Sequence, residues 1–126
     1  MNRYIWSKLG GECAVMQLPI NKYLIIRCAF SDKPWPKDKA PSDQLTSRED
    51  VDTIAKKIMP LLKDAYGTYN IGQEGQSTLQ YARSISPRKE IVASSITDAN
   101  VPLPRNTRMS MYKYNDFMAG QNDKVT

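Results

Sequence analysis

The sequence predicts an α+β fold, with an antiparallel sheet and two helices on one face of that sheet. Three observations predict it: a nearly continuous apolar run over residues 22–30, an amphipathic helical pattern over residues 47–66, and shorter runs separated by glycine and proline. From residue 22 onward the predicted order is strand, helix, strand, strand, helix, strand, which is the ferredoxin-like βαββαβ order. The 126 residues suffice for one two-layer core, so we expect a single domain over residues 1–120.

An N-terminal β-hairpin is predicted before the first core strand. Residues 3–8 and 13–18 flank Gly10 and Gly11, and such a glycine pair is typical of a tight turn. Residues 22–30 follow and are rich in apolar and β-branched side chains, as expected for a central strand. The hairpin therefore extends the predicted sheet.

The clearest predicted element is a helix over residues 47–66. Thr46 and Glu49 have the spacing of a capping box at its start, and Gly67 ends it. Pro60 removes one backbone hydrogen bond, so we expect a kink in the last two turns. The apolar side chains recur at intervals of three and four residues and form one stripe: Val51, Ile54, Ala55, Ile58, Met59, Leu62, Ala65 and Tyr66.

The second half of the chain predicts a hairpin, a helix and a final strand. Residues 68–72 and 77–84 flank a glycine-containing turn and predict the hairpin. Ser86 and Pro87 are suited to open a helix that runs to about Thr97. Residues 107–117 alternate in character and predict the last strand. The polar residues 121–126 predict a flexible tail.

The absence of histidine limits the chemistry open to this chain. Catalytic triads, histidine bases, and histidine-containing zinc or haem sites all require imidazole. Asp50 and Asp52 resemble a metal-binding pair, but on the predicted helix they point about 200° apart. We therefore expect no enzyme activity, no cofactor and no metal site. An enzyme whose site is assembled from other residue types remains the third hypothesis.

Charge, cysteine content and hydropathy indicate a reduced, cytoplasmic protein without membrane contact. Residues 1–45 carry seven positive and four negative charges, residues 46–66 four of each, and residues 67–126 seven and five. This spread lacks the basic stripe typical of dedicated nucleic-acid binders. Cys13 and Cys28 both lie in apolar runs, which predicts core positions. No apolar stretch reaches the roughly 20 residues of a membrane span, and no secretory signal is evident.

The loop over residues 31–43 is the strongest candidate for partner binding. It contains three prolines, which stiffen it, and one tryptophan, a residue enriched in interface hot spots. If Trp35 is an exposed anchor, its replacement by alanine should weaken partner binding and leave the fold intact. The alternative is that Trp35 folds back and covers an edge of the core. The candidate partner-binding residues are Trp35, Lys33, Lys37 and Lys39.

These observations lead to the hypothesis of a small non-catalytic binding protein. It would act by occupying a macromolecule, most simply a protein, as an inhibitor, immunity or anti-defence factor, or assembly subunit. The second hypothesis is nucleic-acid binding by a sheet face on which aromatic and basic side chains alternate. Its candidate residues are Tyr81, Arg83, Arg105, Arg108, Tyr112 and Tyr114.

Overall fold

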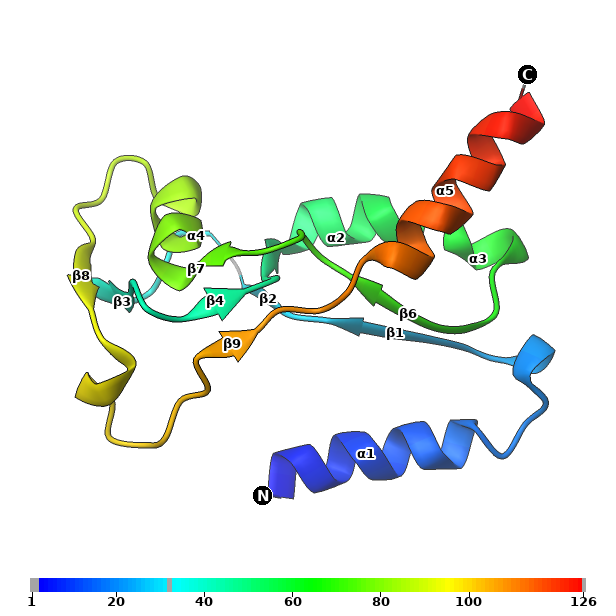
Figure 1. The fold of residues 1–126 in the computed structure, drawn as a ribbon, viewed down its shortest axis with the longest axis horizontal. Helices are drawn as coiled ribbons and strands as arrows, with labels where there is room; N and C mark the ends of the chain where they lie inside the picture. Colours follow the sequence, from blue (N-terminus) through cyan, green and yellow to red (C-terminus); the bar gives the residue numbers. More distant parts are fainter. Residues whose placement is uncertain (1–2, 32, 126) are drawn as a thin grey trace.

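The structure, a computed structural model, describes residues 3–31 and 33–125. Figure 1 shows an elongated molecule in which α2, α3 and α5 lie near the paired strands β1 and β6, and α4 lies near β3 and β8. The helices are α1 (Arg3–Val15), α2 (Val51–Ile58), α3 (Leu61–Asp64), α4 (Thr78–Ile85) and α5 (Tyr112–Val125), with the short 3-10 helices η1 (Ile20–Lys22) and η2 (Ile96–Asp98). The strands are β1 (Leu24–Cys28), β2 (Phe30–Ser31), β3 (Lys39–Pro41), β4 (Leu45–Thr46), β5 (Glu49–Asp50), β6 (Gly67–Ile71), β7 (Gln76–Ser77), β8 (Val92–Ser94) and β9 (Asn106–Thr107).

The predicted α+β character is confirmed, but the ferredoxin-like order and the antiparallel sheet are not. Among the described residues the strands form small separate sheets, and most pairs are parallel. β1 pairs with β6 in register from Leu24 opposite Gly67 to Cys28 opposite Ile71. β4 and β7 form an antiparallel pair. The crossover through α2 and α3 explains the parallel direction of β1 and β6, because it returns the chain to the same end of the sheet.

Two hydrophobic clusters make up the core. The first, which we call the Trp35 cluster, lies between the loop after β2, β3 and α4: Trp35, Ala40, Leu79, Tyr81, Ala82, Ile85 and Ile91. The second, which we call the β1–β6 cluster, has Ile54, Leu61, Tyr69 and Ile71 at its centre. Partly buried side chains of β1 and α5 pack against this second cluster, including Cys28, Tyr114 and Phe117. The chain therefore has two small centres of packing.

The predicted N-terminal hairpin is wrong, because residues 3–15 form α1. Gly10 and Gly11 lie inside this helix, and a Cβ atom at either would meet no atom within 4 Å. Glycine weakens a helix interior by about 0.5–1 kcal/mol without forbidding it. The three-four spacing of Trp6, Leu9, Cys13 and Met16 was the helical signal that the glycine pair obscured.

The helix predicted over residues 47–66 exists as two shorter helices. α2 ends at Ile58 and α3 begins after Pro60, so the proline separates the helices where a kink was expected. The cap also differs, since the Asp50 carboxylate accepts a hydrogen bond from the Thr53 backbone N–H at 3.1 Å. Thr46, the predicted cap, is buried in β4 instead.

Residues 77–84, predicted as a strand, contain most of α4. Ser77 and Gln80 form a complete capping box at its start, a local signal that the strand prediction overlooked. Leu79, Ala82 and Ile85 are buried on one side at intervals of three residues. The second half of the predicted hairpin is therefore a core helix.

The last two predicted elements are also corrected. The helix predicted over residues 86–97 is replaced by β8, which pairs with β3, and by η2. The strand predicted over residues 107–117 is replaced by an extended segment and α5. α5 continues through residues 121–125, where the sequence predicts a tail, and Thr126 lies outside the described residues. The pairing of β8 with β3, and the packing of Tyr114 and Phe117 of α5 against the β1–β6 cluster, outweigh the local pattern.

Candidate functional site

Trp35 is buried, so of the two alternatives for this residue the structure shows the one in which it packs against the core. Only 6% of it is exposed, and its ring meets the Tyr81 ring edge-on with centroids 6.2 Å apart. The Trp35 backbone N–H donates to the Ser86 hydroxyl at 2.6 Å, and the indole N–H donates to the Lys39 carbonyl at 3.2 Å. The Arg48 guanidinium lies over the ring, 5.6 Å from its centroid. Because Trp35 is buried, we expect Trp35→Ala to destabilise the fold.

The loop that carries Trp35 is fixed at both ends of β3. The Val92 N–H donates to the Asp38 carbonyl at 2.9 Å, and the Ser42 N–H donates to the Ser94 carbonyl at 2.9 Å. The Lys89 ammonium donates to the Trp35 carbonyl at 3.1 Å. These bonds tie the proline-rich loop to β8 and to the turn after α4, so the loop presents one fixed surface.

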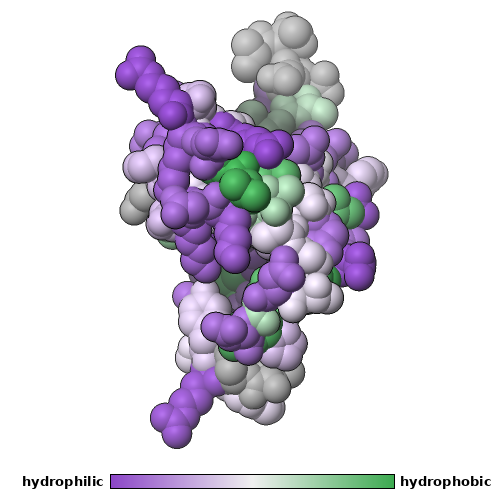
Figure 2. All heavy atoms as spheres, turned by 90° about the vertical axis from the view of Figure 1, so that its left-hand side faces the viewer, coloured by the Kyte–Doolittle hydropathy of each residue, from purple (hydrophilic) through white to green (hydrophobic). Residues whose placement is uncertain are grey.

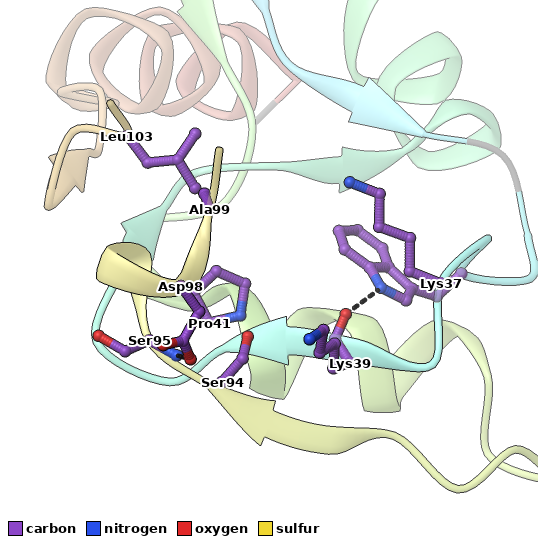
Figure 3. A pocket seen from close by; sticks show the side chains of 9 residues that line it. Lys37, Lys39, Pro41, Ser94, Ser95, Asp98, Ala99 and Leu103 are labelled. Atoms are coloured by element: carbon purple, nitrogen blue, oxygen red, sulfur yellow. Dashed lines mark hydrogen bonds between the residues drawn. The ribbon is translucent and has the colours of Figure 1, made fainter. Parts of the chain in front are cut away.

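A small pocket lies against the buried tryptophan. It encloses about 150 Å³ and is lined mainly by apolar surface. Lys37 and Lys39 lie on one side of it, and Ala99 and Leu103 on the other (Figure 3). The lining residues are Trp35, Lys37, Lys39, Pro41, Ser94, Ser95, Asp98, Ala99 and Leu103. The pocket thus combines an indole edge, aliphatic walls and two exposed ammonium groups.

Two lysines and one aspartate line the pocket, so positive charge is in excess there. Among the described residues, no carboxylate forms an ion pair with Lys37 or Lys39. Asp98, which also lines the pocket, accepts a hydrogen bond from the Ser95 backbone N–H at 2.9 Å. The face of the molecule at this end is largely hydrophilic, with a small hydrophobic area on it (Figure 2). The free ammonium groups can therefore bind an anionic group from outside the chain.

An aspartate beside the pocket is used for structure. The Asp43 carboxylate accepts from the Ser95 hydroxyl at 2.6 Å and from the Ile96 N–H at 2.9 Å. The Ser95 hydrogen bond is the main reason that the pKa of Asp43 lies below its usual range. Asp43 is therefore held ionised by its hydrogen bonds and fixes the start of η2. Such a group is poorly placed to serve as a general base.

Lys33, the fourth candidate of the loop, lies away from this pocket. Its ammonium is 3.9 Å from the Asp50 carboxylate, and it lines a separate open hollow with Ser31 and Asp52. The structure therefore brings Trp35, Lys37 and Lys39 together and leaves Lys33 apart. Ser94, Ser95 and Asp98 also line the pocket. The sequence did not indicate them as site residues, because they lie in or directly after the segment that was predicted as a helix.

The six candidates for nucleic-acid binding do not share a sheet face. Tyr81 is 1% exposed on α4, and its hydroxyl lies 2.8 Å from that of Ser31. Arg83 is also on α4, and its guanidinium donates to the Ile91 carbonyl. Tyr114 packs against the β1–β6 cluster. Four of the six are exposed: Arg83 lies on α4, and Arg105, Arg108 and Tyr112 lie around β9 and at the start of α5.

The two cysteines differ from each other. Cys13 is exposed on α1, which corrects its predicted core position, whereas Cys28 is half-buried against the β1–β6 cluster. Burial raises the pKa of the Cys28 thiol. Both are free thiols.

Comparison with known proteins gives no match: no protein-family model, curated protein or solved structure matches this chain. Within residues 3–31 and 33–125, no helix is both long and apolar enough to cross a bilayer. The same residues contain no group of three or more cysteine, aspartate or glutamate side chains placed to hold a metal ion.

Proposed function

We propose that this chain is a small non-catalytic binding protein that occupies a protein partner through the pocket beside Trp35. The observation that supports the proposal is that Lys37 and Lys39, which form no ion pair among the described residues, line a pocket with apolar walls and a fixed tryptophan. The fitting partner segment has an acidic side chain beside an apolar one. The carboxylate meets the lysines while the apolar group enters the pocket.

The rigidity of the loop supports recognition of this kind. Trp35 is held by Ser86, Lys39 and Lys89, so little conformational entropy is lost when a partner docks. Trp35 thus acts as part of a preformed wall, in place of the exposed anchor that the sequence suggested. A pocket of about 150 Å³ admits one side chain. The rest of the interface must come from the surrounding surface.

The chemistry of the pocket favours binding over catalysis. Its acid, Asp98, is bound to the Ser95 backbone, and the Ser95 hydroxyl donates to Asp43. Ser95 has no neighbouring imidazole, because the chain contains none. The group within hydrogen-bond reach of its hydroxyl is the Asp43 carboxylate, whose pKa lies below its usual range. Such a carboxylate is a weak base for the activation of a serine nucleophile.

The test is affinity capture from a lysate of the source cells with three baits: the parent chain, a double variant Lys37→Glu plus Lys39→Glu, and the control Lys56→Glu. Lys56 is exposed on α2 and outside the pocket, so its reversal changes net charge without touching the site. We expect the parent and the control to retain the same protein in stoichiometric amount. Charge reversal in the pocket should weaken its binding about tenfold or more, which is at least about 1.4 kcal/mol.

Two outcomes would count against the proposal, and one control checks the fold. Equal capture by the double variant would remove the pocket from consideration. Recovery of RNA or DNA in place of protein, with affinity that falls steeply between low and physiological salt, would support the nucleic-acid hypothesis. Circular dichroism of the double variant should match the parent, since both lysine side chains are exposed and form no ion pair among the described residues.

A further inference from the structure

The pocket beside Trp35 carries opposite charges on its two sides. Lys37 and Lys39 lie on the side of the indole, whereas Asp98 lies on η2, on the side of Pro41 (Figure 3). All three charged side chains are exposed. Among the described residues none of the three forms an ion pair, so the lysines and Asp98 do not neutralise each other. The pocket therefore has a positive end and a negative end.

The position of Asp98 is fixed by the capping of η2. Its carboxylate oxygen Oδ2 accepts from the Ser95 N–H at 2.9 Å, and its own N–H donates to the Ser95 carbonyl at 3.0 Å. Ser95 is held in turn by Asp43, which accepts from its hydroxyl at 2.6 Å. The other carboxylate oxygen of Asp98, Oδ1, accepts no hydrogen bond from the described residues. One free carboxylate oxygen provides too few ligands for a metal ion, but it suits an ammonium or guanidinium group.

The two ends of the pocket belong to one rigid unit. Lys39 lies in β3, and its carbonyl accepts from the Trp35 indole N–H at 3.2 Å. β3 pairs with β8, with Pro41 opposite Ser94, and the chain continues from β8 into η2, which carries Asp98. Because β3 and β8 are joined by backbone hydrogen bonds, the fold sets the separation of the positive and negative ends before a ligand arrives.

The other walls of the pocket are mainly apolar, and they include Trp35, Pro41, Ala99 and Leu103. A charged group placed against these walls would lose its hydration without gaining a partner. A ligand therefore fits when its apolar part contacts these walls and its charged groups lie at the ends, each opposite a charge of the other sign.

We propose that the pocket recognises a dipolar segment of the partner, in which an acidic and a basic side chain lie on opposite sides of an apolar one. The acidic group binds Lys37 and Lys39, the apolar group enters the pocket beside Trp35, and the basic group binds the free oxygen of Asp98. This inference rests on the proposed function, to which it adds the basic group and its position. Asp98 repels a carboxylate placed at its end of the pocket, so it selects against segments that carry only negative charge.

The probe for a dipolar pocket is ε-aminocaproate, in which an aliphatic chain joins a carboxylate to an ammonium group. Caproate lacks the ammonium group, and hexylamine lacks the carboxylate. Each compound is titrated into the purified chain, and the chemical shifts of the backbone amides that line the pocket report binding. We expect a dissociation constant on the order of millimolar for ε-aminocaproate, which should bind about threefold to tenfold more tightly than caproate. Hexylamine should bind most weakly, because the two lysines repel it.

Asp98→Asn removes the negative charge and keeps an oxygen that can accept from the Ser95 N–H. This variant should lose the preference for ε-aminocaproate, while its affinity for caproate stays the same or rises. The matched control is Asp116→Asn, at an exposed aspartate of α5 outside the pocket, which should bind all three compounds as the parent does.

Equal affinities of the parent for ε-aminocaproate and caproate overturn the inference, as does an Asp98→Asn variant that keeps the preference. If caproate still binds at the pocket in either case, the acidic and apolar contacts of the proposed function remain, and the basic contact is absent. A parent chain that does not bind ε-aminocaproate at about 20 mM also overturns the inference. The proposed function then still depends on the capture experiment, in which Asp98 is unchanged.

Discussion

Arg27 in β1 and Glu12 in α1 form a bidentate ion pair, with both nitrogen-to-oxygen distances at 2.7 Å. The pair joins the N-terminal helix to the first core strand. Because α1 buries none of its own side chains, this contact has a large share in holding the helix against the strand.

Glu12→Gln should loosen α1 without unfolding the body. The side chains of Arg27 and Glu12 are 47% and 23% exposed, so the loss of stability should stay within about 1 kcal/mol. The Arg27 hydrogen bond lowers the pKa of Glu12 below its ordinary value. The contribution of the pair is therefore full above the ordinary glutamate range and is lost as pH falls through the lowered pKa. Hydrogen exchange should show faster exchange in α1, with β1 and β6 unchanged; protection of α1 equal to the parent would contradict this role.

Trp35→Ala should destabilise the protein by about 3–5 kcal/mol, because it empties the centre of the Trp35 cluster. Trp6→Ala is the matched control: this tryptophan is exposed on α1, so its loss should change stability by less than about 0.5 kcal/mol. Urea denaturation measures both changes in stability. Similar midpoints for the two variants would contradict the buried position of Trp35.

Tyr81→Phe should cost about 0.5–1.5 kcal/mol at neutral pH, since it removes the hydroxyl that bonds to Ser31. Tyr112→Phe, at an exposed side chain, serves as the control for the same chemical change. Burial raises the pKa of Tyr81, and also that of Tyr69 and Tyr114. The folded state therefore favours the neutral phenols, and unfolding free energy should fall as pH rises above about 10. Tyr81→Phe should make that fall shallower in chemical denaturation; an equally steep fall would argue against a buried phenol.

Gly72→Ala should destabilise the protein by about 1–3 kcal/mol, because the new Cβ would clash with the Ser47 carbonyl oxygen. Ser47 is itself buried, and its hydroxyl accepts a hydrogen bond from the Met109 N–H at 2.9 Å, which limits its freedom to move. Gly120→Ala in α5 meets open space and should stabilise by up to about 1 kcal/mol. Thermal melting of the two variants should move in opposite directions. A shift in the same direction would mean that the contact with Ser47 is easily relieved.

Sequence patterns correctly predicted those helices and strands whose intrinsic conformational preference matches the packing they have in the fold. Residues 22–30 contain β1 and the first residue of β2, and residues 68–72 contain most of β6, because apolar runs of that kind suit covered strands. The helix after residue 50 was found from its three-four spacing, and its interruption from Pro60. Strand direction was not predictable, since it depends on which distant segment each strand meets.

The errors came from signals that carry two meanings. Gly10 and Gly11 suit a turn but lie in a helix, while the glycine-containing turn before Ser77 favoured a hairpin over the helix that the capping box begins. Within the candidate site, Trp35, Lys37 and Lys39 could be selected because one loop contains them. Ser94, Asp98 and Leu103 could not, since parallel pairing of β3 with β8 brings them in from more than fifty residues away.

The two hydrophobic clusters are built from interleaved lengths of chain. The β1–β6 cluster takes residues 24–28, then 54–71, then 114–117, and the Trp35 cluster takes residues 35–40 and 79–91 from the stretches between them. The backbone thus passes from one cluster to the other four times. No single break in the backbone can separate them, so a truncation from either end that removes one of these stretches leaves a cluster incomplete. Two complementary fragments should recover the native packing only when both are present in the same solution.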